Sequence, residues 1–179
     1  MFIVLEGLDG AGKTEVSHLL ANELGAYIYR TPPDDYKTIR SNVDSIGCKL
    51  SQFYYYMSGV FYASIQIEEL INGGRIVICD RYYYSTLAYF SELPEANIVN
   101  ISRLLQPDYA FFLNVADDAV REARVCGRAN SGWAEEMCSK SYERSRIIAA
   151  YQRFNLISIE TSDLSIAEVV ERIKRCIQK

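Results

Sequence analysis

Residues 2–14 read FIVLEGLDGAGKT, and this stretch decides the fold. The apolar run 2–6 predicts a buried strand, and apolar residues at helical spacing predict a helix over residues 13–24. The glycine-rich segment between them follows the pattern G-x-x-x-x-G-K-[ST], in the strand-to-helix context that a phosphate-binding loop requires. The residues that match the pattern are Gly7, Gly12, Lys13 and Thr14.

The loop favours a bound nucleoside triphosphate. Backbone N–H groups around Gly10 and the amino end of the following helix offer partial positive charge to phosphate oxygens. Lys13 is expected to reach the β and γ phosphates, and Thr14 to offer its hydroxyl to Mg²⁺. A GTPase would also need a guanine-reading NKxD motif, which the sequence lacks. We therefore expect a small phosphotransferase that uses ATP and Mg²⁺.

Strand-like and helix-like segments alternate along the rest of the chain. This order predicts an α/β fold of the three-layer P-loop NTPase type, a five-stranded parallel sheet with helices on both faces and a short lid. The 179 residues are expected to form one domain, residues 1–179, with the lid at about 127–134. The expected strands are 2–6, 26–30, 75–79, 109–115 and 156–160; the expected helices are 13–24, 35–46, 49–71, 117–126, 135–154 and a last one opened by a capping box at Ser165 and Glu168.

The bulk properties narrow the classes of partner and compartment. A net charge of −4 and a pI of about 5.1 disfavour a nucleic acid polymer or an anionic membrane as a partner, so we expect small-molecule nucleotides. No apolar run approaches the roughly 20 residues of a membrane span, and the loop begins too early for a signal peptide to precede it. The five cysteines include no CxxC pair, which is typical of reduced thiols in a cytoplasmic protein.

A second informative stretch, CDRYYYSTLAYF, spans residues 79–90. Asp80 follows a predicted buried strand and is placed to hold Mg²⁺. Arg81 beside it offers a planar fork that can bridge two phosphoryl groups. The alternative is a surface ion pair at a strand end. Because Glu6, Arg30 and Asp80 all end predicted parallel strands, we expect these charged residues around one crevice.

Together, GLDGAGKT and DRYYYSTLAYF resemble the thymidylate kinase family, whose corresponding segments read EGxDGxGKS/T and DRYxxSxxAYQ. The resemblance extends over nearly the whole chain. The aromatic run 53–56 and the segment Arg124-x-x-Gly127-Arg128 are closer to the mitochondrial UMP-CMP kinase branch of that family. The resemblance implies transfer of the γ-phosphoryl group of ATP to a pyrimidine (deoxy)nucleoside monophosphate, dTMP to dTDP first among them, by a homodimer.

The resemblance also implies a role for each site residue. Asp9 places a carboxylate inside a loop that binds phosphates, which it would repel. The resemblance implies that this carboxylate faces the acceptor nucleotide; the rival interpretation is that Asp9 caps the following helix. An aromatic ring of the long helix is expected to stack on the base, and Tyr89 to crowd the sugar 2′ position. The acceptor-binding set implied is Asp9, Arg30, Arg40, Tyr55, Tyr56, Arg81, Ser85 and Tyr89.

A departure from the family pattern concerns the base. Thymidylate kinases carry an arginine shortly after the stacking aromatic, but here no Lys or Arg occurs between Lys49 and Arg75, and Phe90 replaces the usual glutamine. Base preference is therefore left open, while phosphoryl transfer is not affected.

The family takes its transition-state arginine from the phosphate loop or from the lid. Because Ala11 stands before Gly12, the loop offers no cation beyond Lys13, and Arg128 in the lid is the expected catalytic arginine. Arg124 is expected to lie along the adenine, although both arginines could be solvated charges at a helix end. The predicted catalytic set is therefore Lys13, Arg81, Arg128 and Asp9. Two rival functions remain, a deoxynucleoside kinase and a non-catalytic nucleotide-binding module.

Overall fold

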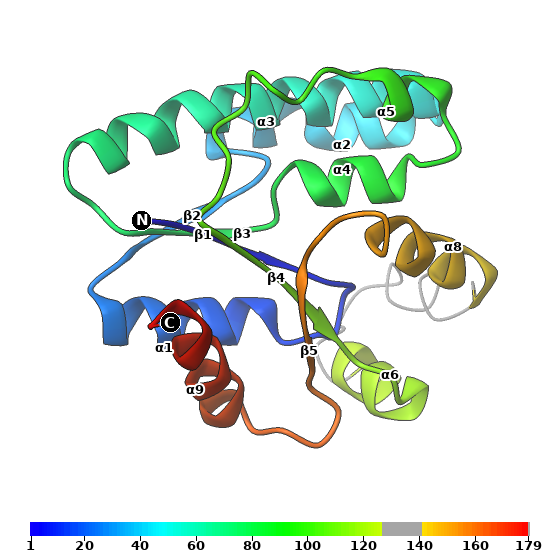
Figure 1. Ribbon diagram of the computed structural model, residues 1–179. Helices are drawn as coiled ribbons and strands as arrows, with labels where there is room; N and C mark the ends of the chain where they lie inside the picture. Colours follow the sequence, from blue (N-terminus) through cyan, green and yellow to red (C-terminus); the bar gives the residue numbers. More distant parts are fainter. Residues whose placement is uncertain (127–140, 179) are drawn as a thin grey trace.

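A computed structural model describes residues 1–126 and 141–178. Its centre is a five-stranded parallel sheet in the order β2-β3-β1-β4-β5 (Figure 1). The register pairs Leu5 with Asp80, so the carboxyl ends of β1 and β3 lie side by side. The strands are β1 (Phe2–Glu6), β2 (Tyr27–Arg30), β3 (Val77–Asp80), β4 (Tyr109–Asn114) and β5 (Ile157–Glu160).

Helices cover both faces of the sheet, which confirms the predicted three-layer α/β fold. Figure 1 shows α1 and α9 below the sheet and α2, α3, α4 and α5 above it, with α4 closer to the sheet than α3. The helices are α1 (Lys13–Leu24), a short 3-10 turn η1 (Asp34–Tyr36), α2 (Lys37–Ser45), α3 (Lys49–Asn72), α4 (Tyr83–Tyr89), α5 (Pro94–Ile98), α6 (Asp118–Cys126), α8 (Ser141–Tyr151) and α9 (Ile166–Ile177).

The core divides into two layers because successive side chains of a strand point to opposite faces. From β1, Phe2 and Val4 join the layer beneath α3 and α4, whereas Ile3 and Leu5 pack against α1 and α9. A strand buried on both faces must be apolar throughout, as β1 is until its last residue, Glu6. The strand β1 therefore carries Glu6 to the crevice at its carboxyl end.

Several predicted boundaries were wrong, and two helices were not predicted. The segment expected as one helix over 35–46 begins as the 3-10 turn η1, and the strand expected at 75–79 runs from Val77 to Asp80. The helix expected to reach Phe154 ends at Tyr151. The predicted lid, 127–134, lies outside the described residues. The unpredicted helices α4 and α5 follow the Asp80–Arg81 segment, where a tyrosine-rich sequence is not typical of a helix.

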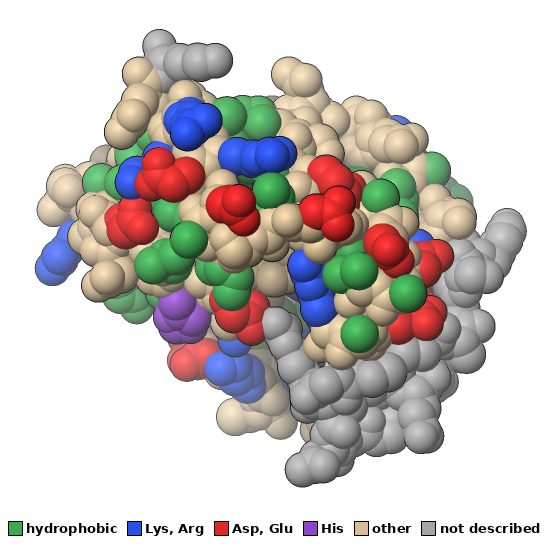
Figure 2. Space-filling model, turned by 90° about the horizontal axis from the view of Figure 1, so that it is seen from below, with side chains coloured by type: hydrophobic (Ala, Val, Ile, Leu, Met, Phe, Trp, Pro, Cys, Tyr) green, Lys and Arg blue, Asp and Glu red, His purple; other side chains and the backbone are tan. Residues whose placement is uncertain are grey.

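The face of the molecule in Figure 2 has no extended basic patch, as expected for an acidic protein. Acidic and basic side chains are interspersed there with hydrophobic ones. Among the residues that the structure describes, no helix is both long and apolar enough to cross a membrane.

Candidate active site

The loop between β1 and α1 holds a shape that other residues could not adopt. Gly7 has φ +143°, and a Cβ there would lie 2.4 Å from the carbonyl oxygen of Leu113. Gly10 has φ +88°, and its Cβ would lie 3.0 Å from the carbonyl oxygen of Arg121. Gly12 precedes α1 with no side-chain cap, so the first N–H groups of the helix are open to an anion. Asp9 does not cap α1, which removes the rival interpretation of this carboxylate.

Lys13 lies almost fully inside the loop. Its Nζ donates to the carbonyl oxygen of Leu8 at 2.8 Å, so the ammonium folds back over the segment that would hold phosphates. Burial, together with repulsion from Arg81, lowers the pKa of Lys13 to about 8. Two cations held close together in a poorly hydrated site favour binding of a polyanion.

Asp9 and Arg81 form the ion pair at the centre of the site. Arg81 Nη2 donates to Asp9 Oδ1 at 2.7 Å, joining the loop after β1 to the turn after β3. Burial opposes ionisation of Asp9, but the attraction of Arg81 and Lys13 outweighs it and lowers the pKa of Asp9 below its ordinary value. Both groups are therefore charged at neutral pH.

Arg81 is held in a strained backbone conformation. Its φ is +72°, a left-handed value that is uncommon for a residue with a Cβ and costs free energy. Arg81 N donates to Leu5 O at 3.0 Å, and its carbonyl oxygen accepts from Thr31 Oγ1 at 3.0 Å and from Cys79 Sγ at 2.9 Å. These contacts fix the turn that aims the guanidinium at Asp9.

Glu6 was predicted only as one of the charged residues around the crevice, but it organises this corner of the site. The side chain is fully buried, and it accepts hydrogen bonds from Tyr82 N at 2.7 Å, Ser85 N at 3.3 Å and Tyr151 OH at 2.9 Å, as well as from Ser85 Oγ. Burial raises the pKa of Glu6 despite these hydrogen bonds. The N–H groups of Tyr82 and Ser85 belong to the start of α4, so the Glu6 side chain, at the end of β1, caps that helix. The sequence feature that could have indicated this role is an acidic residue at the end of an otherwise apolar strand.

Asp80 and Thr14 form the oxygen cluster that was expected to bind metal. Thr14 Oγ1 lies 3.1 Å from Asp80 Oδ2, and Asp80 is buried. Arg30 Nη2 lies 3.4 Å from the same Asp80 oxygen, with the arginine side chain about half exposed. The structure therefore brings Arg30, which was predicted on the acceptor side, against the predicted metal ligand.

Comparison with known proteins decides the family. The thymidylate kinase family model matches residues 5–173. The chain belongs to the thymidylate kinase family. A probable thymidylate kinase of Methanocaldococcus jannaschii is 30% identical over 181 residues, covering 97% of this chain and 93% of the relative. A probable thymidylate kinase of Staphylothermus marinus is 34% identical over 140 residues, covering 70% of this chain and 68% of that protein.

Solved structures support the fold. A thymidylate kinase of Candida albicans superposes with a TM-score of 0.76 at 17% identity, over 98% of this chain and 90% of that one. A deoxyadenosine kinase of M. mycoides, solved with bound dATP, gives a TM-score of 0.67 at 19% identity over the full length of both chains. The fold is thus shared with a nucleoside kinase as well, and the acceptor must be argued from the site.

Arg40, predicted for the acceptor phosphate, lies on α2, and Tyr55 and Tyr56, predicted for the base, lie on α3. Arg40 stacks over the ring of Tyr56 at 5.8 Å and pairs with Asp44 at 3.4 Å. Tyr55 is buried, and its hydroxyl donates to the carbonyl oxygen of Tyr36. Phe90, which stands where thymidylate kinases carry glutamine, packs its ring against Tyr56 at 6.0 Å. Tyr56 is therefore better placed than Tyr55 to meet a ligand.

Ser85 and Tyr89 lie on α4 beside the central ion pair. Arg81 Nη1 donates to Ser85 Oγ at 3.3 Å, and the Arg81 guanidinium lies over the ring of Tyr89 at 5.5 Å. Both residues thus contact the same guanidinium that pairs with Asp9 of the phosphate loop.

The two arginines predicted for the lid side have different outcomes. Arg124 donates from Nη2 to the carbonyl oxygens of Thr161 and Ser162, at 2.9 and 3.2 Å, so it ties α6 to the turn after β5. Arg128 lies outside the described residues, and its predicted role stays a prediction.

Proposed function

We propose that this protein transfers the γ-phosphoryl group of ATP to dTMP, yielding dTDP and ADP. Family membership supports the reaction class, and the Asp9–Arg81 ion pair carries the assignment within the site. The guanidinium of Arg81 lies between the phosphate loop and α4, so it can contact one phosphate from ATP and one from the acceptor. A simple ATPase has no acceptor nucleotide for the Asp9 carboxylate to face.

The reaction needs alignment and charge neutralisation but no general base. An oxygen of the ionised acceptor phosphate attacks Pγ, the bond from Pγ to the bridging oxygen breaks, and ADP leaves with its electron pair. Lys13 and Arg81 neutralise charge on the transferred group, and the open N–H groups of the loop hold the remaining phosphates. Asp9 keeps Arg81 oriented toward the loop.

Mg²⁺ fits the residues present, because Thr14 and Asp80 bring a hydroxyl and a buried carboxylate within 3.1 Å of each other. Hard cations of this kind prefer oxygen ligands, and a bound Mg²⁺ would neutralise phosphate charge. Asp80 would hold the ion through its carboxylate, directly or through water, and Thr14 through its hydroxyl.

The acceptor phosphate is assigned to Arg30 and Arg40, each about half exposed and therefore accessible to a ligand. Tyr56 is assigned to the base with Tyr55 supporting it, and Ser85 and Tyr89 to the sugar side. ATP is assigned to Gly7, Gly10, Gly12, Lys13, Thr14 and Arg124.

Discrimination between bases is expected to be weaker than is usual in the family. No Lys or Arg lies between Lys49 and Arg75, so a charge-assisted contact to the base carbonyl is missing. Such a contact contributes about 1.5–3 kcal/mol. We therefore expect dUMP to be used at a rate closer to that of dTMP. The closer kinship with UMP-CMP kinases stays a proposal, and UMP and CMP belong in the same panel.

The experiment measures ADP release with dTMP, dUMP, dCMP, UMP and CMP, and with thymidine and deoxyadenosine as nucleoside acceptors. The proposal expects turnover with the monophosphates and none above background with the nucleosides. Phosphorylation of a nucleoside in preference to dTMP would make the protein a deoxynucleoside kinase. Tight ATP binding without turnover of any acceptor would make it a non-catalytic binding module.

We also propose that the protein forms a homodimer, as the family resemblance implies. The support in the structure is apolar surface on α3, where Tyr54 and Ile65 are each more than half exposed. Light scattering after size-exclusion chromatography tests it, with a dimer mass expected and a monomer mass at micromolar concentration contradicting it.

A further inference from the structure

Arg121 is a buried cation of α6 that the reaction described above does not use. The residue is 8% exposed, and its Nε is shielded from solvent without a hydrogen-bond partner. Within residues 1–126 and 141–178, its guanidinium donates no hydrogen bond, and the single ion-pair contact is Nη2 to Glu122 Oε1 at 3.9 Å. Burying a charge with so few partners among the described residues is costly, so the guanidinium is available to an anion that binds beside it.

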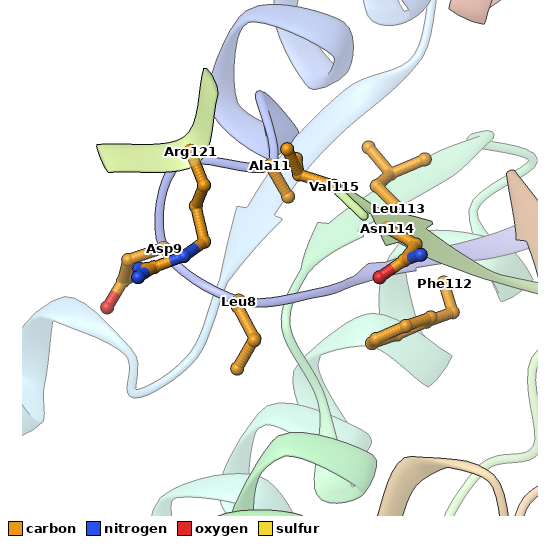
Figure 3. A pocket seen from close by; sticks show the side chains of 8 residues that line it. All are labelled: Leu8, Asp9, Ala11, Phe112, Leu113, Asn114, Val115 and Arg121. Atoms are coloured by element: carbon orange, nitrogen blue, oxygen red, sulfur yellow. The ribbon is translucent and has the colours of Figure 1, made fainter. Parts of the chain in front are cut away.

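The side chain of Arg121 lies on the phosphate loop. A Cβ on Gly10 would be 3.1 Å from Arg121 Cγ, so the absence of a side chain at Gly10 leaves the space that the arginine stem occupies. Arg121 lines the small pocket together with Leu8, Asp9 and Ala11, and Figure 3 shows it extending from α6 toward Asp9. Its positive charge is one of those that lower the pKa of Asp9.

Two cations therefore reach the loop from different elements. Arg81 comes from the end of β3, and Arg121 comes from α6. The loop itself has Gly10 and Ala11 at the positions facing Arg121, so it supplies no cation of its own there. A dry, buried arginine stem with a guanidinium beside a phosphate cradle is preorganised for an anion.

We infer that Arg121 is a catalytic residue that contacts the γ-phosphoryl group of ATP and stabilises it during transfer. The inference rests on the proposed function for its kinetic consequence, but the contact with the γ-phosphate is a property of ATP binding alone. The γ-phosphoryl group adds a counter-charge beside a guanidinium that donates no hydrogen bond within residues 1–126 and 141–178.

The test uses Arg121→Gln, with Arg172→Gln on the exposed side of α9 as a control that removes the same charge. In Arg121→Gln, kcat with dTMP falls about 10³-fold or more while the KM for dTMP changes less than about threefold. The melting temperature of the free variant stays the same or rises, because a poorly compensated buried charge is gone. A residue needed only for the fold would instead lower the melting temperature and leave kcat of the folded fraction intact.

A binding measurement separates this inference from the proposed function. The Kd for ATP and the Kd for ADP are measured by calorimetry without acceptor, and the ratio of ADP to ATP affinity in Arg121→Gln shifts about tenfold or more against ATP. If the parent protein does not phosphorylate dTMP, this ratio still decides whether Arg121 contacts the γ-phosphate. An unchanged ratio, or a kcat within about threefold of the parent, overturns the inference. If Arg121→Gln does not fold, Arg121→Lys replaces it, with at least a tenfold loss of kcat expected because the fork is lost, and parent-like kcat overturning the inference.

Discussion

Replacing Asp9 by asparagine tests the central ion pair with little change of shape. In the parent protein, Arg81 Nη2 lies 2.7 Å from Asp9 Oδ1. The amide oxygen of asparagine can still accept this hydrogen bond, but the negative charge is lost. A hydrogen bond to a charged group contributes about 1.5–3 kcal/mol, against about 0.5–1.5 for a neutral pair. These two ranges differ by about 1–1.5 kcal/mol when their lower ends and their upper ends are compared, and partial exposure of the Asp9 and Arg81 side chains, 33% and 21%, argues against a larger loss. The variant should therefore lose about 5- to 12-fold in kcat/KM for dTMP.

The assay is steady-state ADP release, with dTMP varied at saturating ATP and then ATP varied at saturating dTMP. The KM for ATP should change less than about twofold, because Lys13 and the loop N–H groups are not altered. Glu171→Gln is the control, since it removes an acid that pairs with Lys174 on α9. Parent-like kcat/KM for dTMP in the Asp9 variant, or an equal loss for both substrates, would refute the reasoning.

Three further changes probe the metal, the loop and the acid stability. Asp80→Asn should raise the Mg²⁺ concentration for half-maximal rate about tenfold or more, read from a Mg²⁺ titration; an unchanged midpoint argues against the metal assignment. Gly10→Ala should lower the free energy of unfolding by about 1–3 kcal/mol, and by more than the control Gly25→Ala, whose Cβ meets nothing, as thermal melts would show. Burial raises the pKa of Glu92, but its contacts with Lys49 of α3 and Arg146 of α8 outweigh burial and lower the pKa below its ordinary value. We therefore expect Glu92→Gln to lower the free energy of unfolding by about 0.5–1 kcal/mol at pH 7. That difference should shrink as the pH falls from about 4.5 through the lower folded-state pKa, and a difference that does not shrink in urea unfolding at decreasing pH would contradict the assignment.

The sequence predicted the parts of the site that depend on local pattern. The glycine loop, Lys13 and the charged end of β3 could be found because their spacing, and the strand or helix next to each, are written in adjacent residues. The five strands were also found; β1 and β3 are fully buried, and strands buried on both faces are continuous or nearly continuous apolar runs. Their ends were off by one or two residues, as at Asp80, since the register is set by neighbouring strands.

The parts that were missed depend on contacts between distant segments. Glu6 caps α4 across 76 residues of sequence, and no local pattern marks an acid for that role. The helix α4 itself begins with tyrosines of low helix propensity, so its stability comes from burial and from Glu6 rather than from its own sequence. Arg121 was not singled out in the sequence, because only the packing of α6 on Gly10 shows that it is buried.

The most direct test of the account is the identity of the product. The protein is incubated with ATP, Mg²⁺ and dTMP, and the nucleotides are separated by anion-exchange chromatography, with Lys13→Ala as the control for contaminating kinases. The account predicts one dTDP for each ADP formed, and neither product above background in the control. ADP formed without dTDP would show that water is the acceptor, and would contradict the role assigned to the Asp9–Arg81 pair.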